Sequence, residues 1–172
     1  MLTAAFEDWP LPREPFRAVF AATAFHWIDP AVGLERAAAA LEPGGALAVV
    51  TTSHVAGGDE RFFVAVQDCY ERFMPGTPPG LRLSSAADVP SERAMLEAGG
   101  RFERAAARRY EREIAYTTAE YLDLLCTYSN HRTLAAHARE ALLRCIARLI
   151  DERHGGRIAK RYLNELIVAY RA

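Results

Sequence analysis

The chain has 172 residues, of which 51% are hydrophobic and 25% are charged, and its formal net charge at pH 7 is −1. This length predicts one domain, or two at most, and the composition is that of a folded protein with a sizeable core rather than of a disordered chain. A net charge this close to zero creates no global field that attracts nucleic acid or an anionic membrane surface, so we expect neither as a partner.

The cysteines and the apolar segments indicate where the protein is located. The three cysteines are an odd number without a CxxC pairing: Cys69, Cys126 and Cys145. This pattern argues against a disulfide framework and for a reducing, cytoplasmic location. No stretch approaches 18 unbroken apolar residues, and no basic region with an apolar core follows Met1, so the sequence predicts neither a membrane span nor a signal peptide.

The first elements are predicted to be a strand, a helix and a second strand. Residues 18–28 (AVFAATAFHWI) are apolar and uncharged, which is typical of a strand buried on both faces of a parallel sheet. Asp29 and Pro30 then predict a helix start, because Asp suits the N-cap and Pro the first helical position. The turn at residues 43–45 (PGG) ends this helix. A second apolar strand is predicted at residues 46–51, so the order implies a right-handed crossover and a parallel pair.

The middle of the chain is predicted to hold two helices, a loop and an edge strand. A break at residues 57–59 is followed by apolar residues at helical spacing over residues 62–73. Residues 75–90 are typical of a loop, and residues 91–98 of a short helix. Residues 102–116 carry charge on both sides, which favours a strand at the edge of a sheet.

The last part of the chain begins with a strong helix start. Thr117 and Glu120 have the spacing of a capping box. Apolar residues at helical spacing over residues 142–150 predict an amphipathic helix, which the glycines at 155–156 end. Residues 163–170 (LNELIVAY) fit a helix or a strand equally well.

Three segments resemble the class I S-adenosylmethionine-dependent methyltransferases: FEDWPLP (6–12), FRAVFAATAFHWIDP (16–30) and LEPGGALAVVTTSH (41–54). In that family an acidic and proline turn follows the third strand, the fourth strand ends near the reacting methyl group, and a helix leads to an L-x-P-G-G-x-L turn and the fifth strand. The ending AFHW-acidic-P, with YTTAEYLDLLCTYSNHRTL and GGRIAKRYLNELIVAYR later on, is similar to the small-molecule branch that includes trans-aconitate methyltransferase-like proteins.

The resemblance implies an α/β fold, namely an incomplete Rossmann-like methyltransferase sheet flanked by helices and carrying a helical cap. The glycine-rich turn after the family's first strand, and the acidic residue ending its second strand, are missing here. We therefore expect a single partial domain over residues 1–172. Residues 1–58 form the C-terminal part of the cofactor-binding sheet, residues 59–156 the helices, cap and edge strand, and residues 157–172 the last strand. A displaced gene start, a truncated protein and a second chain that supplies the front half remain open.

The missing first strand has a structural consequence. In the family the fourth strand pairs with the first, so residues 18–28 would lie at an edge here. An apolar unpaired edge is a docking site or an aggregation template. We therefore expect a homo-oligomer, a partner chain that completes the sheet, or poor stability.

The resemblance also assigns residues to a cofactor site for S-adenosylmethionine. Ala5 and Phe6 match the positions that meet the adenine, and Ala22 and Thr23 match the strand end that passes the sulfonium and ribose. His26 lies at the end of the predicted fourth strand, where α/β sheets bind ligands, so it is the candidate catalytic base or hydrogen-bonding group. The alternative for each is ordinary packing or a solvated turn.

The candidate substrate-binding residues are Trp27, His54, Tyr128 and His131. His54 follows the second apolar strand, and the last two belong to the predicted cap; surface or packing roles are the alternatives. No His, Cys, Asp or Glu cluster has metal-ligand spacing, so no metal is predicted. The expected function is methyl transfer to an unidentified small molecule. The alternative is a non-catalytic remnant, or a subunit that pairs with another chain through the sheet edge.

Overall fold

A computed structural model describes residues 3–172 and divides the chain into two compact units. The first unit runs through Ser53 and adds Val89–Tyr110 and Leu163–Ala172; the second comprises His54–Asp88 and Glu111–Tyr162. Three long strands contribute residues to both units: β2 (Leu41–Gly58), β3 (Phe102–Thr117) and β4 (Arg157–Arg171). The predicted boundaries at residues 58 and 156 stay predictions.

The sheet has the order β1-β2-β4-β3 among the described residues. β1 (Phe16–Ala22) pairs in parallel with β2, with Ala22 opposite Val50, which confirms the predicted parallel pair. Hydrogen bonds join Asp59 to Ala159 and Thr52 to Asn164. Because the residue numbers rise along β2 as they fall along β4, the two strands are antiparallel. β3 lies at an edge, as its charge pattern predicted.

The predicted buried strand at residues 18–28 was wrong in length and in burial. β1 ends at Ala22, and Phe25–Trp27 form a short 3₁₀ helix, η1. Thr23, whose φ is +47°, interrupts the extended backbone between them. One face of β1 is exposed, with 67% of the Phe20 surface accessible, whereas Val19 and Ala21 on the other face pack against the core of the unit. The edge position itself was expected and is confirmed.

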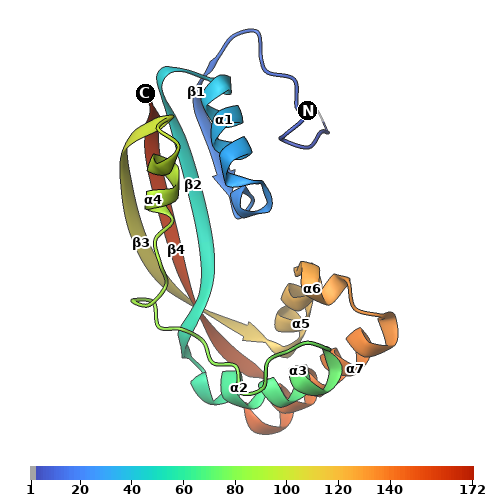
Figure 1. Ribbon diagram of the computed structural model, residues 1–172. Helices are drawn as coiled ribbons and strands as arrows, with labels where there is room; N and C mark the ends of the chain where they lie inside the picture. The colour runs from blue at the N-terminus through green and yellow to red at the C-terminus, as the bar shows by residue number, and fades with distance from the viewer. Residues whose placement is uncertain (1–2) are drawn as a thin grey trace. The chain divides into compact units, whose positions relative to one another are not determined.

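In the first unit, α1 (Pro30–Ala40) lies alongside β1 and β2 (Figure 1). The Asp29 carboxylate accepts hydrogen bonds from the Ala31 and Val32 amides at 3.0 and 3.1 Å, so the predicted cap is confirmed. The unit also contains α4 (Arg93–Ala98), whose Leu96 is buried. Its core joins both helices to the sheet, and Phe6 packs against this core.

The second unit is mainly helical and holds the second core. Its helices are α2 (Glu60–Ala65), α3 (Gln67–Phe73), α5 (Thr118–Thr127), α6 (Ser129–Arg132) and α7 (Ala136–Arg153). The predicted capping box at Thr117 and Glu120 is present. The predicted apolar stripe of α7 is confirmed, because Leu142, Ile146 and Ile150 are buried.

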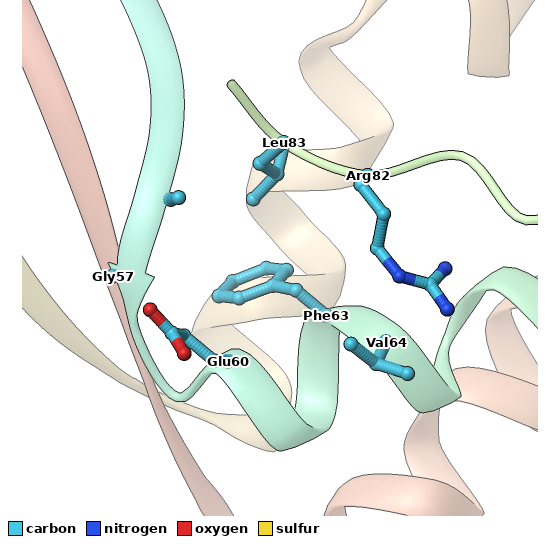
Figure 2. Close-up of a pocket in the computed structure, with 7 residues that line it drawn as sticks. Gly57, Glu60, Phe63, Val64, Arg82 and Leu83 are labelled. Carbon is cyan, nitrogen blue, oxygen red and sulfur yellow. The ribbon is translucent and has the colours of Figure 1, made fainter. Parts of the chain in front are cut away.

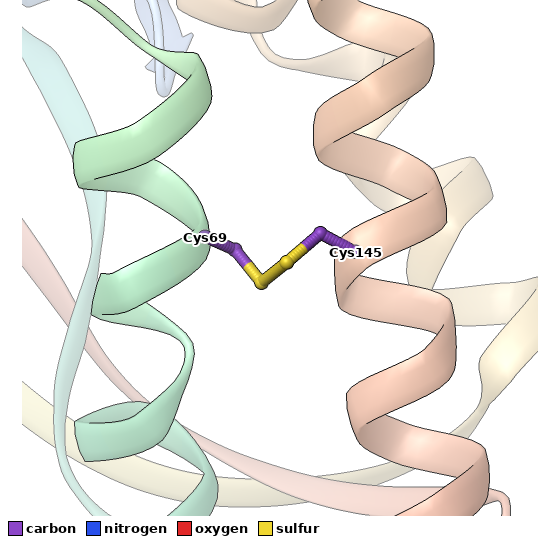
Figure 3. The surroundings of a disulfide bond; sticks show 2 residues. All are labelled: Cys69 and Cys145. Atoms are coloured by element: carbon purple, nitrogen blue, oxygen red, sulfur yellow. A yellow bond between two sulfur atoms is a disulfide. The ribbon is translucent and has the colours of Figure 1, made fainter.

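A disulfide joins Cys69 of α3 to Cys145 of α7, as Figure 3 shows. The argument from the sequence against a disulfide framework was therefore wrong for this pair. The 76-residue separation carries no local signal, and it is the packing of α3 against α7 that brings the two Cα atoms to 5.9 Å. Cys126 is free and exposed. The cytoplasmic location stays a prediction, and the cysteines no longer support it.

Residues 163–170 adopt the strand alternative, as part of β4. β4 pairs on both sides, with β2 and with β3, so the sheet supplies hydrogen bonds along both edges of this segment. None of the helices in residues 3–172 combines the length and the hydrophobicity that a membrane span requires.

Candidate functional site

A cavity of about 410 Å³ lies within the second unit. The residues that determine its chemistry come from two strands, three helices and the residue between two of those helices: His54, Tyr70, Tyr121, Tyr128, His131 and Lys160. Leu81, Leu83 and Met74 add apolar surface from the loop after α3. The cavity is therefore mostly apolar and aromatic, with a few polar groups, which is the usual character of a small-molecule site.

Three of the four predicted substrate-binding residues line this cavity: His54, Tyr128 and His131. His54 lies in β2, Tyr128 between α5 and α6, and His131 in α6. The fold thus brings together side chains that are up to 77 positions apart in the sequence. Their part in binding a ligand stays a prediction.

Lys160 of β4 is the central charged group of the cavity. Only 3% of its surface is accessible, and burial lowers its pKa to about 8. Its Nζ donates a hydrogen bond to the Tyr128 Oη at 2.7 Å and lies 4.8 Å from the centre of the Tyr162 ring. Among residues 3–172 it forms no ion pair. The ammonium is stabilised by a phenol and by ring faces, without a neutralising carboxylate.

His131 is held by hydrogen bonds at both ring nitrogens. Its Nδ1 lies 2.9 Å from the Asn130 Oδ1, so this nitrogen donates and the other accepts. The Tyr70 hydroxyl then donates to Nε2 at 3.2 Å. Burial, with the nearby charge of Lys160, lowers the pKa of His131. Burial, with Tyr128, raises the pKa of Tyr70. At neutral pH this pair is therefore an uncharged phenol and an uncharged imidazole.

His54 supplies a polar atom without a protein partner. Its Nε2 is buried and has no hydrogen bond among the described residues. Its ring meets Phe63 edge-on, with ring centres 4.5 Å apart. Burial and then the charge of Lys160 lower the pKa of His54 to about 3, so it is neutral at pH 7. A buried polar atom left without a partner is costly unless a ligand or a water satisfies it.

A smaller hollow of about 210 Å³ lies nearby in the same unit (Figure 2). Among the lining residues in Figure 2, the Phe63 ring lies between Glu60 and Arg82. Leu83 lines both this hollow and the larger cavity. Phe63 lines the smaller hollow, and its ring contacts the ring of His54, which lines the larger cavity. Phe63 therefore links the two.

The remaining predicted residues lie in the first unit. Ala22 and Thr23 are exposed at the carboxyl end of β1, and the Thr23 amide donates to the Val50 carbonyl at 2.8 Å. His26 and Trp27 follow on η1 with ring centres 4.9 Å apart, and Trp27 is 69% exposed.

Two other first-unit residues were assigned to the adenine. Ala5 is exposed, whereas Phe6 is partly buried against the core of the unit. Among the described residues no His, Cys, Asp or Glu cluster suits a metal ion.

The sequence analysis missed Lys160 and Tyr70. The sequence offered one signal for Lys160. It is the only lysine of the chain, and the other 20 of the 21 Lys and Arg residues are arginines. Tyr70 falls within residues 62–73, where the spacing predicted only a helix, and it is the packing of α3 near α6 that brings its hydroxyl to His131.

The chain matches no protein-family model and no curated protein sequence. Among solved structures it is similar to a candidate type II methyltransferase from Anaeromyxobacter dehalogenans, with 25% identity over 98% of this chain and 69% of the other and a TM-score of 0.50. A candidate methyltransferase from Bacillus halodurans has 18% identity, coverages of 97% and 69%, and a TM-score of 0.49.

A third similar structure is a Haemonchus contortus phosphoethanolamine N-methyltransferase in complex with phosphomonomethylethanolamine and S-adenosylhomocysteine. It shares 13% identity over 97% of this chain and 36% of its own, with a TM-score of 0.41. The trans-aconitate branch stays a prediction. The described residues have the predicted α/β fold, a four-stranded sheet flanked by helices, which matches the Rossmann-like fold of the methyltransferase structures.

Proposed function

We propose that this protein takes part in S-adenosylmethionine-dependent methyl transfer to a small molecule, and that the cavity of the second unit binds this molecule. The observation that carries the proposal is the gathering of His54, Tyr128 and His131, which the family resemblance assigned to substrate, around one cavity with Lys160. The fold likeness to a candidate methyltransferase at 25% identity supports it.

The residues at the end of β1 fit the cofactor. S-adenosylmethionine, when bound, supplies the activated methyl group. Three small exposed residues in succession, from Ala22 to Ala24, leave the backbone open to a close ligand at the carboxyl end of a parallel strand. The left-handed φ of Thr23 is of the kind found at ligand sites. In the proposal Ala22 and Thr23 hold the sulfonium and ribose, and Ala5 and Phe6 meet the adenine.

The chain's own groups would contribute alignment and proton handling. In the second unit, the neutral His131 fixes the Tyr70 hydroxyl, and Lys160 and His54 offer hydrogen bonds to the acceptor molecule. In the first unit, His26 remains the proposed proton acceptor and Trp27 a wall of the ligand site, because both are exposed next to the end of β1.

Calorimetric titration of the 172-residue protein with S-adenosylhomocysteine tests the cofactor. We expect micromolar binding. Ala22→Trp should weaken it at least tenfold, because the bulky ring blocks the approach to the backbone. Ala31→Trp, at an exposed position of α1 in the same unit, is the matched control and should bind as the parent does. Absence of binding heat in the folded parent protein contradicts the cofactor assignment.

A second candidate function is that of a non-catalytic subunit that pairs with a second copy of this chain. β1 is at a sheet edge among the described residues, and Phe16 and Phe20 are exposed on it. An unpaired apolar edge favours strand addition. Sedimentation should then show a dimer that Phe20→Arg dissociates, together with no cofactor binding. A monomer at high concentration contradicts this candidate.

A further inference from the structure

The ammonium of Lys160 is the only charged group in the cavity of the second unit, and it has no anionic partner in the described chain. The described lining contains no Asp or Glu. The hydrogen bond to Tyr128 and the ring faces of Tyr128 and Tyr162 stabilise the ammonium, but none of them neutralises it. A buried charge without a counter-charge is costly, so such a site favours a ligand that brings the opposite charge.

Every other titratable group that faces Lys160 is neutral at pH 7. The pKa values of His54 and His131 are lowered by burial and by Lys160 itself. The phenols stay protonated because burial raises their pKa values; these are Tyr70, Tyr121, Tyr128 and Tyr162. The cavity therefore presents one positive charge.

A second unsatisfied group lies within the field of this charge. The buried His54 Nε2 has no hydrogen-bond partner in the described chain, and His54 and Lys160 line the same cavity, where both lie near the Tyr162 ring. A carboxylate has two oxygens and accepts from more than one donor. One carboxylate would thus give Lys160 a counter-charge with one oxygen and leave the other oxygen to accept a hydrogen bond from His54 Nε2.

We propose that this cavity selects a small molecule with a single carboxylate attached to an apolar body, with the carboxylate paired to the Lys160 ammonium and the apolar body against Tyr121, Leu125 and Leu83. The inference rests on the proposed function only in naming this monocarboxylate as the methyl acceptor.

The charge count determines the selectivity. A dicarboxylate or tricarboxylate would neutralise Lys160 and leave at least one further carboxylate in an apolar surrounding, which costs free energy. A cationic amine would meet the like charge of Lys160, although aromatic rings line the site. A neutral amide would leave the ammonium without its partner. The single lysine therefore favours a ligand with one negative charge over neutral, cationic and multiply anionic ligands.

Nuclear magnetic resonance of the protein labelled with ¹⁵N-lysine tests this directly, because the chain has one lysine and hence one side-chain amine signal. The probes are 3-phenylpropanoate, 3-phenylpropanamide and propane-1,2,3-tricarboxylate, without cofactor. We expect 3-phenylpropanoate to bind saturably and to raise the pKa of Lys160 above about 8, since a bound anion favours the protonated amine. The amide and the tricarboxylate should bind at least tenfold more weakly.

The parent protein provides a second readout that requires no variant to fold. Affinity for 3-phenylpropanoate should fall above pH 8, as the free amine loses its proton. Equal binding of acid and amide, tighter binding of the tricarboxylate, or an acid affinity that stays constant across this range overturns the proposal.

Two variants give the matched comparison. Lys160→Met keeps the length of the side chain and removes its charge, so it should lose acid binding at least tenfold. Arg161→Met removes a positive charge at the next, half-exposed residue of β4 and should bind as the parent does. Because these measurements omit the cofactor, acid binding without S-adenosylhomocysteine binding overturns the proposed methyl transfer alone, and the reverse result overturns the monocarboxylate alone.

Discussion

The Lys160 Nζ donates a hydrogen bond to the Tyr128 Oη at 2.7 Å, and this phenol is the only hydrogen-bond partner of the ammonium among the described residues. Tyr128 follows the last turn of α5, whereas Lys160 lies in β4. The buried charge is therefore held by a contact between a helix end and a strand.

Removing this contact should change the titration of the lysine. In Tyr128→Phe the ammonium loses an acceptor, and a hydrogen bond to a charged group is worth roughly 1.5 kcal/mol or more. We expect the pKa of Lys160 to fall further below about 8, as measured by the pH dependence of its ¹⁵N signal. Tyr162→Phe keeps the ring that faces the ammonium and serves as the control. A pKa that Tyr128→Phe leaves unchanged contradicts this account.

Acidification should destabilise the protein through His54. The folded-state pKa of this residue is about 3, against 6.5 for an ordinary histidine, so between these values the unfolded chain binds a proton that the folded chain does not. The contribution of His54 to the unfolding free energy is therefore complete above pH 6.5 and is lost as the pH falls toward 3. After allowance for partial solvent screening, we expect a loss of about 2 kcal/mol between pH 7 and pH 4.

Urea unfolding at several pH values measures this loss. In His54→Gln the titrating group is absent, so the fall in unfolding free energy should be smaller than in the parent. His137→Gln, at an exposed position of α7, is the control and should follow the parent curve. Identical pH dependence in His54→Gln and the parent would show that other groups cause the loss.

The disulfide should contribute strongly to stability. Cys69 and Cys145 close a loop of 76 residues, for which the chain-entropy model gives about 4 kcal/mol. We expect reduction, or the Cys69→Ser variant, to lower the unfolding free energy by an amount of this order. Cys126→Ser removes the free, exposed thiol and should change little. Equal unfolding free energies with and without a reductant count against the bond.

A buried ion pair in the first unit should be costly to break. Glu165 is 3% exposed; its carboxylate accepts from the Arg109 Nε at 2.7 Å and from the Glu92 amide at 3.2 Å. Burial acts to raise the pKa of Glu165, but the hydrogen bonds from Arg109 and its other partners outweigh burial and lower it.

Arg109→Met leaves this carboxylate without its cation. Because Arg109 is itself partly exposed, we expect a loss of about 2 kcal/mol, somewhat below the usual cost of breaking a buried pair. Arg108→Met, at the neighbouring exposed position of β3, is the control and should lie within about 0.5 kcal/mol of the parent by urea unfolding. A variant at Arg109 as stable as this control contradicts the role of the pair.

Local sequence determined the elements whose signals lie within a few residues. Asp29 and Pro30 predicted the start of α1, and Thr117 with Glu120 predicted the start of α5, because a cap is formed by neighbouring backbone and side-chain groups. The apolar spacing of α7 predicted its buried face, since periodicity alone defines one side of a helix.

Tertiary structure decided what depends on distant partners. Residues 163–170 form a strand because β2 and β3 pair on either side, and Cys69 meets Cys145 because α3 packs on α7. The site follows the same rule: the sequence indicated His54, Tyr128 and His131 through a resemblance, but the burial of Lys160 beside them arises from contacts far apart along the chain. Charge and reactivity depend on that burial, which no local pattern specifies.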